Sequence, residues 1–381
     1  MDRDLHRGRE IVRQFTPNWF TATMGTGILA LALNQFPRHI PGLHSVAQGL
    51  WLLNIFLFLV FSALYLARWI VHNKEARRIF GHSVVSMFFG AIPMGLATII
   101  NGFLVFGLPL WGNLALQTAR GLWWLDALMS VACGVLIPFM MFTRQEHSLE
   151  KMTAVWLLPV VAAEVAAASG AVLVPHMLDS QAALRIIVIS YVLWAFSVPL
   201  AMSILVILLT RLVLHKLPSS DMAATGWLAL GPIGTGALGL MLLGNDASQV
   251  FPTAGLPGIG EVAFGIGAIG GSMLWGYGLW WLFIALLTTA RYLQHDLPFN
   301  LGWWGFTFPI GVYAVATLTL ARLTHIGFLT VIGGALVIGL SALWLTISTR
   351  TLHGAWYGYL FVAPCLVPGS IPADRQMEPE Y

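Results

Sequence analysis

Ten long apolar stretches, separated by charged or Pro- and Gly-rich breaks, dominate this chain of 381 residues. A helix needs about 20 consecutive apolar residues to cross the hydrocarbon core of a bilayer. We therefore predict an all-α integral membrane protein with ten transmembrane helices. The first stretch is the weakest, because it is short and interrupted by Thr and Gly. The predicted spans are Asn18 to Leu33, Val46 to Val71, Ser83 to Phe106, Leu122 to Phe142, Met152 to Val174, Leu184 to Leu212, Met222 to Gly244, Gly258 to Thr288, Trp303 to Ala321 and Gly327 to Ser348.

The composition agrees with lipid as the solvent. Only 9% of residues are charged and 58% are hydrophobic, whereas soluble globular chains carry about 25% charged residues. The net charge of +3 does not indicate a nucleic-acid partner, because the Lys and Arg form no basic face interleaved with polar spacers. The chain has too little polar surface for a water-soluble fold of this length.

The basic residues predict the orientation, because cytoplasmic loops retain Lys and Arg. Fifteen of the 19 Lys and Arg lie on the side of the N-terminus. The other side holds Arg38, Arg120, Arg185 and Arg322. We expect a multi-pass protein of the cell (inner) membrane with both termini in the cytoplasm. The N-terminus shows no cleavable signal peptide. The expected organisation is a cytoplasmic segment over 1–14, a transmembrane domain over 15–350 and a cytoplasmic tail over 351–381.

A proline recurs in or just before the first half of each odd-numbered span. The five residues, 66 to 77 positions apart, are Pro17, Pro93, Pro159, Pro232 and Pro309. This spacing predicts five copies of a helical hairpin. A proline leaves a backbone carbonyl without its donor, which is tolerated in a membrane only where protein or water satisfies it. We expect the odd spans to surround a polar axis and the even spans to form an outer ring. Kinked helices without a pore are the alternative, and prolines in two even spans weaken the contrast.

Hydroxyl and amide groups are frequent in the odd spans, and no Lys or Arg lies deep in any span. Such dipoles favour weak anion binding and fast exit. Alternatively, each hydroxyl bonds back to its own helix. The candidate lining residues are Thr21, Thr23, Thr26, Ser86, Thr98, Asn101, Ser169, Thr235, Thr307 and Thr317, together with the prolines.

Two motifs carry a family resemblance: FTPNWFTATMGTG from Phe15 to Gly27 and NLGWWGFTFPIG from Asn300 to Gly311. With the ten spans, they resemble the tellurite-resistance/dicarboxylate transporter (TDT) family of the voltage-dependent anion channel superfamily. It includes bacterial TehA, the fungal malate permease, the fungal sulfite efflux pump and the plant slow anion channel. The resemblance extends to about His353, and the first motif is closer to the malate and sulfite branches.

The resemblance implies a homotrimer in which each protomer has its own pore. It also implies that the five odd helices line this pore in a quasi-five-fold arrangement. A phenylalanine of the ninth span is expected to plug the pore at mid-membrane. By motif position this residue is Phe308, directly before Pro309, and Phe306 is the second match.

One acidic residue, Glu164, lies about halfway along the fifth span. An ionised carboxylate at that depth costs at least roughly 3 kcal/mol, so it is a candidate substrate or proton site. The alternatives are a protonated side chain bonded to a carbonyl or a pairing with another group. Asp126, Asp246 and Glu261 are placed near span ends, within reach of water.

Other signals are discounted. The pattern Gly265 to Gly270 matches a dinucleotide-binding fingerprint but lies inside an apolar span without a preceding strand, so helix packing explains it. Cys133 and Cys365 are expected to be free bystanders. We expect no metal site, no cofactor and no enzymatic activity, because ligand spacings and catalytic clusters are missing.

The predicted function is transport of a small anion. C4-dicarboxylates such as malate and succinate are the first expectation. Sulfite export is the second, followed by an inorganic-anion channel for chloride or nitrate, with a possible link to tellurite resistance. Whether the protein is a channel or a proton-coupled carrier stays open.

Overall fold

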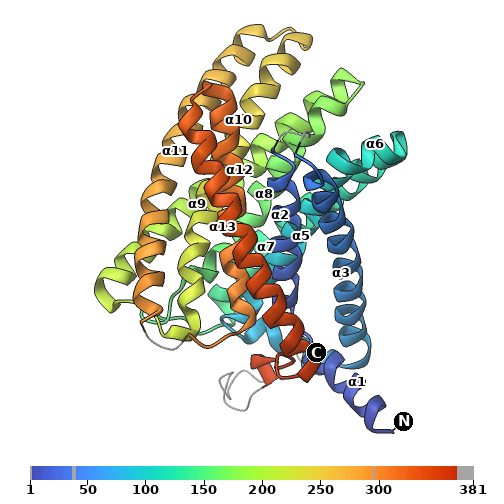
Figure 1. The fold of residues 1–381 in the computed structure, drawn as a ribbon, viewed down its shortest axis with the longest axis vertical. Coiled ribbons are helices and arrows are strands. Elements are labelled where there is room, and N and C mark those ends of the chain that lie inside the picture. The colour runs from blue at the N-terminus through green and yellow to red at the C-terminus, as the bar shows by residue number, and fades with distance from the viewer. Residues whose placement is uncertain (1, 37–39, 295–296, 367–381) are drawn as a thin grey trace.

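The computed structural model of the protein describes residues 2–36, 40–294 and 297–366, and within these ranges the regular structure is helical (Figure 1). Nine helical spans in this described part are long and apolar enough to cross a membrane. Each overlaps one predicted span, which confirms the all-α membrane class. Several run further than predicted, such as the helix that begins at Asn113 rather than Leu122.

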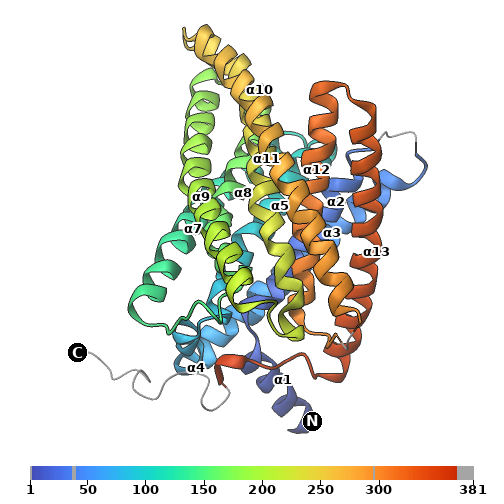
Figure 2. The same ribbon diagram turned by 90° about the vertical axis from the view of Figure 1, so that its left-hand side faces the viewer.

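The helices form two layers (Figures 1 and 2). The outer helices are α3 (Leu43–Val71), α7 (Asn113–Thr143), α9 (Ser180–His215), α11 (Pro257–Tyr292) and α13 (Gly327–Tyr357). The inner helices are α2 (Thr21–Leu33), α5 (Ala91–Gly102), α8 (Leu158–Leu173), α10 (Leu230–Thr253) and α12 (Thr307–Thr324). The most apolar part of each outer helix is only 22–33% buried, against 72–94% for the spans of α5, α8, α10 and α12. The outer layer therefore offers the apolar surface that a bilayer requires.

The inner helices pack as a closed ring. Helix α2 contacts α5, α5 contacts α8, α8 contacts α10, α10 contacts α12, and α12 returns to α2. These inner helices correspond to the odd-numbered predicted spans. Each contacts the next odd-numbered span in chain order, and the ninth span contacts the first.

Helix α2 belongs to this ring although it is short. Together with η1 (Pro17–Phe20) it spans about 28 Å at the rises of 3₁₀- and α-helices, close to the roughly 30 Å of the hydrocarbon core. Every residue of α2 from Thr21 to Ala32 is buried, so polar and small residues are tolerated there. Its crossing of the membrane, and with it the tenth span, stays a prediction.

Each inner helix begins after a 3₁₀ segment. Besides η1, these are η3 (Val85–Gly90), η5 (Ala154–Leu157), η7 (Ser220–Ala229) and η8 (Leu301–Phe306). The recurring prolines lie at these junctions, as the first residue of η1 or the second or third residue of α5, α8, α10 and α12. A proline in the first turn of an α-helix removes an N–H that has no α-helical partner there. At these junctions the prolines therefore do not remove an α-helical hydrogen bond.

Five indole N–H groups of the outer helices connect them to the inner layer. On each outer helix, a tryptophan donates a hydrogen bond to the inner helix of the next hairpin, and α13 donates back to α2. We call these bonds the tryptophan latches. They run from Trp51 to Ile99 O (3.2 Å), Trp123 to Ala166 O (2.9 Å), Trp194 to Gly236 O (2.9 Å), Trp275 to Thr317 Oγ1 (2.8 Å) and Trp344 to Thr26 Oγ1 (3.0 Å).

The first helix α1 (Asp2–Gln14) and the last described segment, η9 (Pro364–Leu366), lie at one end of the bundle, which we call the terminal end (Figure 1). Gln14 Oε1 accepts a hydrogen bond from the Ala363 N–H at 2.7 Å. Two short elements, α4 (Asn73–Arg77) and η2 (Arg78–Gly81), also lie here. Of the basic residues used for the orientation, Arg38 and Arg375 lie outside the described residues.

The end of helix α13 and the contact of Cys365 were not predicted from the sequence. Helix α13 continues to Tyr357, past Ser348, where the tenth span was predicted to end. Cys365 is buried, and its Sγ accepts a hydrogen bond from Arg68 at 3.7 Å. Both Cys133 and Cys365 are free thiols.

Candidate anion pore

A small cavity lies inside the inner ring, toward the terminal end. Its volume of about 20 Å³ is room for about one water molecule. All five inner spans contribute to its wall. The lining residues are Thr21, Met24, Phe88, Val155, Leu158, Thr225, Leu228, Gly302, Trp304, Gly305, Phe308 and Pro309. The cavity lies close to the places where the five 3₁₀ segments pass into the inner α-helices.

The structure separates the two candidate gate residues. Phe308 is 3% exposed and lines the cavity beside Pro309. Phe306 is also buried, but its ring packs against Trp227 and Trp303 at centroid distances of 5.8 and 5.9 Å. Of the two candidate gate residues, only Phe308 therefore lines this cavity.

Two of the candidate threonines are latch acceptors. Thr26 and Thr317 accept their hydrogen bonds from Trp344 and Trp275 on outer helices. Thr98 likewise accepts from the Asn54 amide of α3 at 2.9 Å. In this conformation these three hydroxyls bond toward the outer layer and do not line the cavity.

The glycines of the first motif allow close helix packing. A Cβ at Gly25 would lie 2.3 Å from Thr307 Oγ1, and one at Gly27 would lie 2.0 Å from Thr98 Oγ1. Thr307 also donates to Trp304 O at 2.7 Å. The motif therefore brings α2 into contact with α12 on one side and α5 on the other.

Three other candidate lining residues each have a buried polar atom that makes no hydrogen bond to any of the described residues. These atoms are Asn101 Oδ1, Ser169 Oγ and Thr235 Oγ1. Thr23 donates to Phe20 O at 2.7 Å, within its own segment. None of these residues lines the cavity. They could line a conduction path only if that path extends past the cavity along the inner helices.

Glu164 is fully buried, and neither carboxylate oxygen has a hydrogen-bond partner in the described part of the chain. Ser197 of α9 lies beside it and donates to Val160 O at 2.8 Å. Glu164 therefore lies where inner helix α8 meets outer helix α9, rather than in the cavity wall.

The expectation that water reaches Asp126 is wrong. Asp126 is fully buried, and both of its carboxylate oxygens are without a partner among the described residues. The physical reason is that α7 begins at Asn113, which places Asp126 well inside the helix. Asp246 is also buried, at 6% exposure, whereas Glu261 is exposed.

The sequence did not single out the tryptophan latches or most of the cavity wall. The latch residues Trp51, Trp123, Trp194, Trp275 and Trp344 recur at intervals of 69 to 81 positions. That spacing parallels the proline repeat and was the available signal. The wall residues of η7 and η8 carry no such signal, because their position depends on how distant segments pack. Within the described ranges, no group of three His, Cys, Asp or Glu side chains is arranged to hold a metal ion.

Comparison with known proteins identifies the family of the chain. The sequence model of the voltage-dependent anion channel family matches residues 14–352. This match confirms the resemblance carried by the two motifs.

Individual relatives are transporters. A sulfite efflux pump of Arthroderma otae is 40% identical over 352 residues, covering 92% of this chain and 93% of that protein. An uncharacterized transporter of Methanocaldococcus jannaschii is 29% identical over 92% of this chain and 96% of its own length. The malic acid transport protein of Schizosaccharomyces pombe is 21% identical over 82% of this chain and 72% of its own length.

Proposed function

Since the chain belongs to the voltage-dependent anion channel family, a family of transporters and channels rather than enzymes, we propose that it exports sulfite through the ring of inner helices. The observation that supports a pore is the cavity to which all five inner spans contribute. The similarity to fungal sulfite efflux pumps at 40% identity over most of both chains supports the substrate.

The motif-based preference for C4-dicarboxylates is thus replaced as the leading hypothesis. The malic acid transport protein is a more distant relative, at 21% identity. It keeps malate as a second candidate substrate.

The described conformation is a closed one in this proposal. The Phe308 ring, with Phe88, Leu158 and Leu228, makes the cavity wall apolar, and an apolar constriction in the proposed pore excludes ions that cannot shed water. Movement of the ring would open a path for an anion coordinated by hydroxyl and backbone dipoles. No Lys or Arg lines this cavity, so binding is weak and exit is fast.

We further propose that the terminal end faces the cytoplasm, because it carries the excess of Lys and Arg. A reporter that is active only in the cytoplasm should be active after Tyr381 and inactive when inserted near Gly255. The reverse result at both sites would refute the orientation. The protein is proposed to act as a homotrimer with one pore in each protomer.

The function is tested with the full-length protein in proteoliposomes. Labelled sulfite, malate and chloride fluxes are measured in parallel, with and without a pH gradient. We expect sulfite flux to exceed malate flux at equal concentration. Preferential malate flux would support the second candidate, and no flux of any anion through either the wild type or an opened variant would refute the proposal. Acceleration by the pH gradient would identify proton coupling.

A further inference from the structure

Trp304 is the largest side chain in the wall of the pore cavity. It belongs to η8 and is 3% exposed. Phe308, the proposed gate, follows four residues later and lines the same cavity. The two rings differ in how the protein holds them.

Two hydrogen bonds fix Trp304. Its Nε1 donates to Thr351 Oγ1 of α13 at 3.1 Å, and its carbonyl oxygen accepts from Thr307 Oγ1 at 2.7 Å. Both threonines are buried, and a buried indole N–H that leaves its acceptor is costly. The ring of Phe308 has no polar atom, so it can change rotamer without breaking a hydrogen bond. Trp304 is therefore the fixed ring of the wall, and Phe308 is the ring that can move.

The other edge of the indole packs tightly against α2. A Cβ added at Gly25 would lie 2.7 Å from Cε3 and 3.0 Å from Cζ3 of Trp304, closer than packed carbon atoms come. The glycine of the first motif thus makes room for the tryptophan of the second. The indole extends from Thr351 of α13 to Gly25 of α2, beside the place where the ring of inner helices closes.

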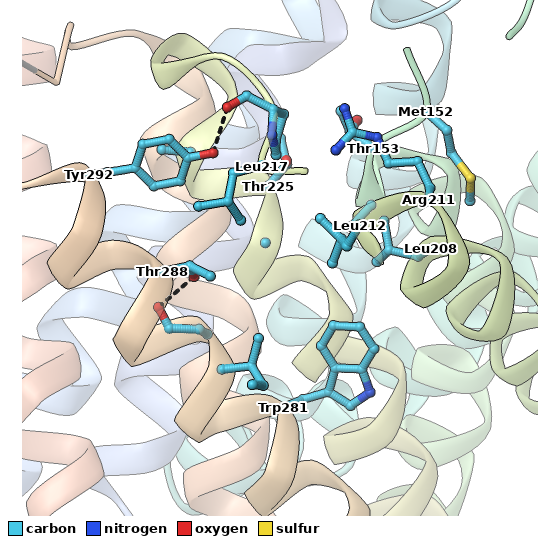
Figure 3. Close-up of a pocket in the computed structure, with 16 residues that line it drawn as sticks. Met152, Thr153, Leu208, Arg211, Leu212, Leu217, Thr225, Trp281, Thr288 and Tyr292 are labelled. Carbon is cyan, nitrogen blue, oxygen red and sulfur yellow. Dashed lines mark hydrogen bonds between the residues drawn. The ribbon is translucent and has the colours of Figure 1, made fainter. Parts of the chain in front are cut away.

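Another part of the wall borders empty space. Thr225 of η7 lines the pore cavity and also a second cavity of about 30 Å³. Figure 3 shows this second cavity, whose wall includes side chains of α9 and α11. The wall can shift at Thr225, whereas Trp304 and Gly25 are already in close contact. When Phe308 moves, the Trp304 side of the pore keeps its position.

The polar groups of the cavity wall are already hydrogen-bonded. Thr21 donates to Asn18 O at 2.5 Å, and Thr225 donates to Met222 O at 2.7 Å. The remaining lining side chains, apart from Trp304, are apolar. At this level the wall therefore distinguishes anions by their size and by the cost of shedding water.

We propose that Trp304 sets the width of the open pore and thereby selects compact anions such as sulfite over longer dicarboxylates, with Thr351 as the residue that positions it. This inference rests on the proposed function. After Phe308 moves aside, the gap beside the fixed indole admits a sulfite ion more readily than malate, whose carboxylates lie at the two ends of a carbon chain.

The test measures labelled sulfite and malate fluxes through the purified full-length protein in proteoliposomes. Phe308→Ala is the reference, because removal of the gate leaves the width set by Trp304. Adding Trp304→Phe shortens the ring and removes its N–H. We expect the ratio of malate to sulfite flux to rise by about tenfold or more, since apolar sites discriminate by about this factor for each methylene group.

Thr351 is tested by two substitutions in the same Phe308→Ala protein. Thr351→Val keeps the shape of the side chain and removes the acceptor of the indole N–H, so the flux ratio should rise by about fivefold. Thr351→Ser retains the hydroxyl and should restore the ratio of the reference. A threonine with a merely structural role would change the yield of folded protein and leave the ratio unchanged.

Trp303→Phe is the matched control. Trp303 is the neighbour of Trp304 in η8, but its Nε1 donates to Pro298 O at 3.1 Å and its side chain does not line the cavity. This variant should keep the flux ratio of the reference. Size-exclusion chromatography and a thermal melt accompany each variant, and Thr351→Val keeps the test decisive if Trp304→Phe fails to fold.

An unchanged flux ratio in folded Trp304→Phe or folded Thr351→Val would overturn the proposed role of Trp304 and leave sulfite export in place. A folded Phe308→Ala protein that conducts neither anion would overturn both proposals. A wild type that carries malate in preference to sulfite, with a ratio that still rises in Trp304→Phe, would refute sulfite export and support the role of Trp304.

Discussion

Replacing Phe308 with Ala should open the pore. Phe308 is 3% exposed, and its ring is one of those that line the cavity of about 20 Å³. Removing it leaves Phe88, Leu158 and Leu228 as the apolar wall and joins the space of the ring to the cavity. We expect sulfite or chloride flux to rise at least about tenfold, equivalent to a barrier lowered by about 1.4 kcal/mol.

The substitution also destabilises the fold. Truncation of a buried Phe to Ala costs about 3 to 5 kcal/mol. The lower end is expected here, because the ring already borders empty space. Loss of fold could imitate a change in gating, so flux in proteoliposomes must be accompanied by size-exclusion chromatography and a thermal melt.

Phe306→Ala is the matched control. It deletes the same atoms two residues earlier, but the ring it removes packs on Trp227 and Trp303. We expect comparable destabilisation without increased flux. If folded Phe306→Ala conducts more and Phe308→Ala does not, the wrong ring was assigned to the gate. If neither conducts more, a phenylalanine plug does not close this pore.

Three further substitutions test other parts of the molecule. Anion flux through the wild type should rise as pH falls, because protonation of Glu164 removes a charge that is disfavoured at this depth and repels anions. Glu164→Gln should flatten the pH profile of the flux. An unchanged profile in this variant would assign Glu164 a structural role. At the terminal end, burial lowers the pKa of His82, whose Nδ1 accepts hydrogen bonds from the N–H groups of Val84 and Val85 at 3.2 Å. The stability that His82 contributes is present above its unfolded pKa of about 6.5 and is lost as pH falls toward the lowered folded pKa. The melting temperature of the wild type should therefore drop between about pH 7 and 5, and that of His82→Asn should drop less. Equal slopes of melting temperature against pH in the two proteins would contradict this assignment. Trp344→Phe should lower the free energy of unfolding by at least about 1 kcal/mol, because the latch hydrogen bond is lost. The free energy is measured by chemical denaturation in detergent, and an unchanged value would mean that this latch does not contribute to stability.

The sequence predicted the elements that depend on local composition. Apolar runs determine where a helix can cross a bilayer, and nine predicted spans correspond to helices in the structure. Proline chemistry is also local, and Pro93 and Pro232 mark the start of their inner α-helices. The apolar length of a helix, however, does not set its first residue, and Asp126 was misplaced for that reason.

The direction of polar side chains could not be predicted in the same way. Thr26 and Thr317 were expected at the pore, yet they accept hydrogen bonds from Trp344 and Trp275. Trp344 and Thr26 are 318 positions apart in the chain, so no local pattern relates them.

The tryptophan latches make the molecule cyclic in a mechanical sense. The bond from α13 to α2 joins an outer-helix tryptophan to the next inner helix, as the other four do, although its acceptor and that of Trp275 are threonine hydroxyls while the other three acceptors are backbone carbonyls. No hairpin of the ring is therefore first or last, and the latches do not determine where in the ring the polypeptide has its ends. The described chain begins and finishes at the same end of the bundle, where Gln14 and Ala363 are in contact. A circular permutant that joins these ends and opens the loop between α9 and η7 would retain every latch, whereas deletion of one hairpin would leave a latch donor and a latch acceptor unsatisfied and an open gap in the wall.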